Sequence, residues 1–160
     1  MTHYPLLFGF RDLVAGRGFL AGVAVNGRAL LVHDDDLGYW MYGVNPGGLA
    51  AGGVDVGEAQ HSFRETYRTV LFDIAEDANS FEEFKAEVHR FFDEAGGFLS
   101  DWTDAVSEVR AGTVKQDWFP EADSSRAKLA IEVTPLSADR LDPRLNEPDE
   151  QAVLAHAVGF

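Results

Sequence analysis

The sequence predicts an α+β fold, in which an antiparallel sheet of three or four strands packs on helices. Two observations lead to this prediction. Over the first fifty residues, apolar residues alternate with polar or small ones between turn residues, which is typical of half-buried strands. From residue 55 the apolar residues recur with a period of roughly 3.6, which is typical of helices that bury one side. With 160 residues, of which 46% are hydrophobic, the chain is long enough to form a core of its own.

Turn residues divide the first part of the chain into its expected strands. Residues 16–18 predict a turn before an apolar strand at 19–25. Asn26-Gly27 is the strongest hairpin signal in the chain, because both residues tolerate a positive φ angle. It predicts a second turn that leads into a returning strand at 29–33.

The next expected turn is acidic. Asp34-Asp35-Asp36-Leu37-Gly38 precedes a strand at 39–44, and Asn45-Pro46-Gly47-Gly48 interrupts that strand. Residues 49–53 then form a short edge strand. Together these segments predict an antiparallel meander.

Three helices are expected after residue 54. Asp55 with Glu58, and Ser80 with Glu83, each fit the capping-box pattern, in which a side-chain oxygen accepts from a free amide of the first turn. Ser100 is the expected cap of the third helix. The side chains expected to face the core are Ala59, Phe63, Tyr67, Val70, Leu71 and Ile74 in the first helix, Phe81, Phe84, Val88, Phe91 and Phe92 in the second, and Trp102, Ala105, Val106 and Val109 in the third.

The last third of the chain is expected to contribute one more strand. Alternation at 128–133 predicts a half-buried strand. Pro148, followed by acidic residues, predicts a short terminal helix that includes Leu154. We therefore expect one α+β domain over residues 1–136 and a C-terminal arm over residues 137–160.

Acidic residues dominate the charge of the chain. Thirteen Lys and Arg stand against 27 Asp and Glu, which gives a formal net charge of −14. Such a chain is repelled by phosphate backbones and anionic lipids, but it attracts basic proteins. No stretch approaches the roughly 18 apolar residues of a membrane span, and no signal peptide is recognisable at the start. We expect a cytoplasmic protein.

The sequence contains no catalytic arrangement that we would assign, and we expect no enzymatic activity, metal or cofactor. Two-metal nucleases need carboxylates that converge from strands onto ions about 4 Å apart. The one dense acidic cluster near the strands, Asp34-Asp35-Asp36, lies in an expected turn, where Asp accepts backbone hydrogen bonds. The five histidines form no His-Glu-x-x-His pattern. The absence of cysteine excludes disulfides, zinc–thiolate sites and a thiol nucleophile.

One expected strand carries most of its aromatic residues in a row. Alternation places Trp40 and Tyr42 on one face of that strand, and Tyr39 and Met41 on the other. One face must pack on the first helix. The other is either covered by the helices of residues 80–111 or left as an apolar patch of the kind that marks an interface. The sequence leaves both alternatives open.

The order of these elements resembles that of the HicB-like antitoxins. The resemblance covers about residues 20–76 and the strand at 128–135: an acidic turn that ends in glycine leads into a strand, a Pro-Gly break follows, and Gly53-Val54-Asp55-Val56-Gly57-Glu58-Ala59 opens a helix. It implies a partial RNase H-like core, into which residues 80–111 insert two further helices. Typical members carry a DNA-binding module after this core. The tail of this chain is instead short, acidic and rich in proline.

The resemblance implies a non-catalytic protein-binding module, an antitoxin-type inhibitor of a small basic toxin. The alternative is a stand-alone structural homo-oligomer of the same fold without a toxin partner. A nucleic acid or a membrane is not expected as a direct partner. The residues expected to contact the partner are Asp34, Asp35, Asp36, Tyr39, Trp40, Tyr42, Asn45 and Gly47.

Overall fold

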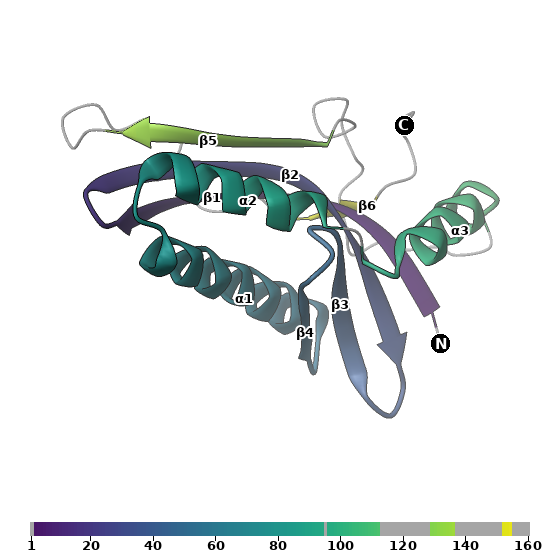
Figure 1. The fold of residues 1–160 in the computed structure, drawn as a ribbon. Helices are drawn as coiled ribbons and strands as arrows, with labels where there is room; N and C mark the ends of the chain where they lie inside the picture. Colours follow the sequence, from purple (N-terminus) through teal and green to yellow (C-terminus); the bar gives the residue numbers. More distant parts are fainter. Residues whose placement is uncertain (1, 95, 113–128, 137–151, 155–160) are drawn as a thin grey trace.

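The computed structural model describes residues 2–94, 96–112, 129–136 and 152–154. The expected α+β fold is confirmed within these residues, where an antiparallel sheet packs on helices (Figure 1). The elements in chain order are β1 (Thr2–Gly16), β2 (Phe19–Asp34), β3 (Gly38–Asn45), β4 (Ala50–Gly53), α1 (Val56–Asp77), α2 (Phe81–Asp93), α3 (Leu99–Arg110), β5 (Ala130–Leu136) and β6 (Val153–Leu154). The strands lie in the order β4-β3-β2-β1-β6, and β5 pairs with β2 outside this path.

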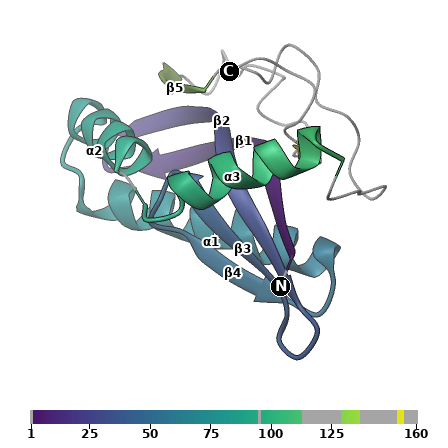
Figure 2. The ribbon, with the colours of Figure 1, turned by 90° about the vertical axis from the view of Figure 1, so that its right-hand side faces the viewer.

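The helices cover both faces of the sheet. Figure 2 shows α3 in front of the strands and α1 behind them. The main core lies between the sheet and helices α1 and α2, where Phe8 meets Phe63 edge-on with ring centroids 5.2 Å apart. A smaller cluster lies under α3, on the opposite face, which we call the outer face. Its buried members are Leu7, Leu30, Val44, Trp102, Ala105 and Val106.

Strands β1 and β2 form one long hairpin. They pair continuously from Thr2 opposite His33 to Gly16 opposite Phe19, and Gly18 makes the turn with a φ of 76°. The predicted hairpin at Asn26-Gly27 is therefore wrong, because both residues lie in the middle of β2 and pair with β1.

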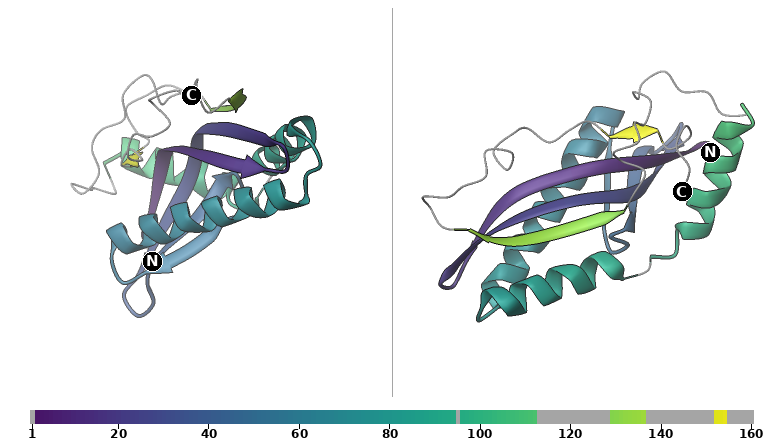
Figure 3. Two further views of the ribbon diagram at one scale, coloured as in Figure 1. Left: turned by 90° about the vertical axis from the view of Figure 1, so that its left-hand side faces the viewer. Right: turned by 90° about the horizontal axis from the view of Figure 1, so that it is seen from above.

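Gly27 is required by a close approach and not by a turn. A Cβ atom at this position would meet the backbone oxygen of Asn45 and would lie 2.7 Å from the Phe8 ring. Strand β2 changes partner here, since residues 20–26 pair with β5 and residues 28–34 pair with β3. Figure 3 shows β5 alongside β2, which confirms that the chain returns to the sheet after its helices.

Two of the three predicted helix caps are confirmed. The Asp55 carboxylate accepts from the amide of Glu58 at 2.8 Å, and the Ser80 hydroxyl accepts from the amide of Glu83 at 3.2 Å. The predicted cap at Ser100 is wrong, because α3 begins at Leu99 and has Phe98 at its N-cap, without a side-chain hydrogen bond.

The C-terminal strand differs from the expected helix. Val153 and Leu154 form β6, which pairs with Leu7 and Leu6 of β1, and Ala152 is fully buried in the main core. The rest of the predicted arm and terminal helix lies outside the described residues. No helix in the described part of the chain is long and apolar enough to cross a membrane.

Candidate protein-binding surface

The three consecutive aspartates connect β2 to β3 at one end of the sheet (Figure 1). One oxygen of Asp34 accepts from the amides of Asp36 at 2.8 Å and of Leu37 at 3.2 Å, and Gly38 completes the turn with a φ of 81°. The prediction that these residues form a turn is confirmed. Asp35 projects into solvent, with its side chain 99% exposed.

The start of α1 brings further carboxylates to the same end of the sheet. A Cβ atom at Gly38 would lie 2.8 Å from the backbone oxygen of Gly53, so the acidic turn adjoins the segment that leads into α1. Burial first, and then the charges of Tyr4, Asp35 and Asp55, raise the pKa of Tyr39. Both aspartates therefore act on one ring.

We call this end of the molecule the acidic tip, and define it by Asp34, Asp35, Asp36, Asp55 and Glu58. The sequence contains no Lys or Arg between Arg28 and Arg64, so the tip has no strongly basic neighbour along the chain. His33 contacts the tip: its Nε2 lies 3.9 Å from an oxygen of Asp35, and its ring stacks on that of Tyr39 with centroids 4.3 Å apart. The tip is therefore a concentrated negative surface.

Large apolar side chains are exposed beside these charges. Leu37 is 71% exposed, Val54 79% and Trp40 40%. They are three of the five large hydrophobic side chains that are exposed in the described part of the chain; Phe72 and Leu99 are the others. Charge and exposed apolar area thus coincide at this end, which is the combination that marks a protein interface.

The two faces of β3 have the predicted composition. Met41 is buried in the main core, and Tyr39 packs against that core. Trp40 and Tyr42 lie on the outer face, where Tyr42 stacks on Phe98 at 4.5 Å and on Trp40 at 6.4 Å. Helix α3 covers part of this face, and Trp40 remains exposed.

Asn45 and Gly47 lie at the opposite end of β3 and make structural contacts. The Asn45 side-chain oxygen accepts from Arg28 Nε at 2.9 Å and Nη2 at 2.6 Å. The Arg28 guanidinium lies 5.1 Å from the centre of the Trp102 ring, and burial lowers the pKa of Arg28. A Cβ atom at Gly47 would meet the backbone of Gly96. The structure thus separates these two residues from the acidic turn and brings the turn together with Tyr39 and Trp40.

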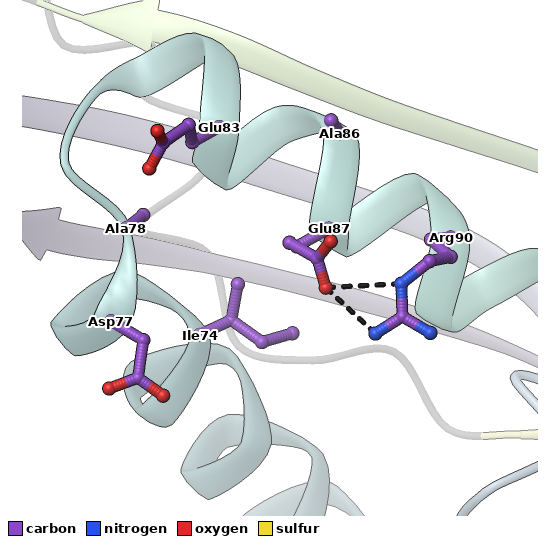
Figure 4. Close-up of a pocket in the computed structure, with 7 residues that line it drawn as sticks. All are labelled: Ile74, Asp77, Ala78, Glu83, Ala86, Glu87 and Arg90. Atoms are coloured by element: carbon purple, nitrogen blue, oxygen red, sulfur yellow. Dashed lines mark hydrogen bonds and ion pairs between the residues drawn. The ribbon is translucent and has the colours of Figure 1, made fainter.

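A groove lies between the end of α1 and helix α2 (Figure 4). It has a volume of about 540 Å³ and is lined by Ile74, Asp77, Ala78, Glu83, Ala86, Glu87 and Arg90. Two of its charged residues pair with each other, with Arg90 Nη2 2.7 Å from Glu87, and the hydrogen bond from Arg90 lowers the pKa of Glu87. Glu83 accepts from the amide of Asn79 at 2.8 Å, just before α2. These charged side chains therefore stabilise α2 and its start. Among the described residues, no group of His, Asp or Glu side chains could hold a metal ion.

Comparison with protein-family models, with curated proteins and with solved structures found no match. The evidence for a function is therefore the chemistry of the surface itself. Sequence reasoning missed Leu37 and Val54, whose exposure follows from the packing of the tip, and it missed the Arg28 contact. The run without Lys or Arg between Arg28 and Arg64 was the available sequence signal for the tip.

Proposed function

We propose that this chain is a non-catalytic protein-binding module of the HicB-like type, which binds a small basic toxin-like protein and blocks it. The observation that supports this most is the acidic tip, where five carboxylates adjoin exposed Leu37, Val54 and Trp40. Negative charge speeds the encounter with a basic protein and fixes its orientation, and burial of the apolar side chains adds affinity. The partner then has a cationic surface with apolar side chains at its centre.

The chemistry of the tip disfavours other classes of partner. Proteins bind nucleic acids and anionic lipids through Lys and Arg side chains, whose contacts with phosphates release counterions. The sequence has no Lys or Arg between Arg28 and Arg64, the segment that forms the tip. A second copy bound through the tip would bring like charges together in a chain of net charge −14. A basic protein meets neither difficulty.

The alternative is a stand-alone homo-oligomer that associates through sheet edges. Strand β5 favours it, because within the described residues β5 pairs with β2 alone and so has one open edge. Association there would leave the acidic tip unused. The two functions therefore predict contacts on different elements.

The test is recovery of the tagged chain from its own cells at low salt, with identification of what it retains. The tip variant carries Asp35→Lys and Asp36→Lys, and keeps Asp34 because that carboxylate holds the turn. The control carries Asp73→Lys and Glu76→Lys, the same charge change at exposed positions of α1.

We expect a basic protein with the wild type and the control, lost from the tip variant and lost at about 1 M salt, where the Debye length falls to about 3 Å. Retention of that protein by the tip variant would contradict the proposal. Recovery of the chain alone, as an oligomer, would favour the alternative.

A further inference from the structure

The strand register aligns a row of residues across the outer face. His3 lies opposite Val32, Val32 opposite Trp40, and Trp40 opposite Gly52. Directly opposite residues share a face, so this row crosses four strands next to the acidic tip. A Cβ atom at Gly52 would lie 2.8 Å from the Trp40 ring, so the indole lies over the glycine. We call this row the shelf.

Helix α3 shows how a helix sits on this face. Trp102, Ala105 and Val106 pack on the outer face, and the Trp102 indole N–H donates to the backbone oxygen of Leu6 at 3.3 Å. Val32 is partly buried against the edge of this cluster, and beyond it Figure 2 shows the ends of β2 and β3 near their turn uncovered by α3. Trp40 accordingly stays 40% exposed.

The spacing leaves room for a second helix beside α3. Side chains on one face of a strand recur about every 7 Å. The cluster under α3 includes Leu30, which is two residues before Val32 on β2 and so about 7 Å from it. It also includes Leu7, which pairs with Arg28, four residues before Val32 and so about 13 Å from it along the strand. Helices pack side by side at about 8–10 Å, which falls between these two distances.

We propose that the shelf binds an amphipathic basic helix of the partner protein, laid beside α3 with its apolar side on Val32 and Trp40. This inference rests on the proposed function and specifies how the partner binds. The charge around the shelf selects the occupant: Asp34 follows Val32 on the outer side of β2, and Asp35 and Asp36 continue the acidic turn beside it. A helix with apolar residues on one side and Lys or Arg on its flanks matches this surface, whereas a second copy of this acidic chain does not.

The probe is a synthetic Leu/Lys peptide of about 14 residues, about 21 Å long as a helix, in which the leucines form one stripe. A second peptide has the same composition but a shuffled order without a stripe. Each is titrated into the full isotope-labelled chain at low salt, and amide and indole NMR signals give both the affinity and the contacted residues. Trp40→Ala is the test variant, and Phe72→Ala is its control, because Phe72 is equally exposed on α1, behind the sheet.

We expect the striped peptide to bind at least roughly tenfold more tightly than the shuffled one, with shifts at Val32, Trp40 and Gly52, and to lose at least roughly tenfold in affinity with Trp40→Ala but not with Phe72→Ala. Val32→Lys is a second variant on the same row, in case Trp40→Ala unfolds. Equal binding of both peptides at the acidic tip alone would overturn the helix site and leave the proposed function standing. Binding of the striped peptide elsewhere would also overturn the helix site. Failure of both peptides to bind would overturn both proposals.

Discussion

At the scale of single residues, the three aspartates of the acidic turn have different roles. Asp34 accepts two backbone hydrogen bonds and so holds the shape of the turn. Among the described residues Asp36 accepts no such bond, and Asp35 forms an ion pair with His33 at 3.9 Å but accepts no backbone hydrogen bond. Charge can therefore be reversed at Asp35 and Asp36 without loss of the turn, whereas Asp34→Lys would change charge and structure together.

Within the described part of the chain, Tyr67 places an unpaired hydroxyl group in the main core. It is fully buried between Phe10 and Phe91, and its hydroxyl has no hydrogen-bond partner among the described residues. An unpaired buried hydroxyl costs about 1–3 kcal/mol. Because Tyr67→Phe keeps the ring contacts, we expect it to raise the free energy of unfolding by about 1 kcal/mol in urea titrations, and Tyr67→Ala to lower it by about 3–5 kcal/mol.

Tyr67→Phe should also change how the stability of the protein depends on pH. Burial raises the pKa of Tyr67 far above its ordinary value. The unfolded chain then loses this proton from about pH 10 upward while the folded chain keeps it, so stability falls as pH rises through that range. Tyr67→Phe should reduce this alkaline loss. Destabilisation by Tyr67→Phe at neutral pH would mean that the hydroxyl has a partner.

At the scale of elements, β2 organises the sheet because it has three partners. It pairs with β1 along its whole length, and its other edge is divided between β5 and β3 at Gly27. We expect Gly27→Ala to lower the free energy of unfolding by about 3 kcal/mol, because the new methyl group would overlap Asn45 and Phe8. Gly97→Ala is the control, since no atom lies within 4 Å of a Cβ there. Equal tolerance of both variants in urea titrations would contradict the continuous β2.

The elements also show what a sequence can predict and what it cannot. The caps at Asp55 and Ser80 were predictable because their hydrogen bonds join residues three positions apart. Asn26-Gly27 misled because a local turn signal says nothing about Asn45, the later residue that makes a glycine necessary. At the candidate site, the acidic turn and the two faces of β3 were predictable from short patterns. The shelf depends on the pairing of four strands, which no local pattern specifies.

At the scale of the whole molecule, the sheet separates two environments. One face carries the main core under α1 and α2, and the other carries a smaller cluster under α3 that ends beside the shelf. The acidic tip lies at the end of the sheet where β2 turns into β3 (Figure 1), in a chain of net charge −14. This arrangement gives one end of the protein both long-range attraction for a cation and apolar side chains for close contact.

We propose that this end of the protein binds a basic protein. The most direct measurement is amide NMR of the full chain with the basic protein that it retains at low salt. We expect the signals of residues 34–42 and 54–58 to shift or broaden, and those of α2 and β5 to stay unchanged. Changes confined to α2 or β5, or the absence of any retained basic protein, would contradict it.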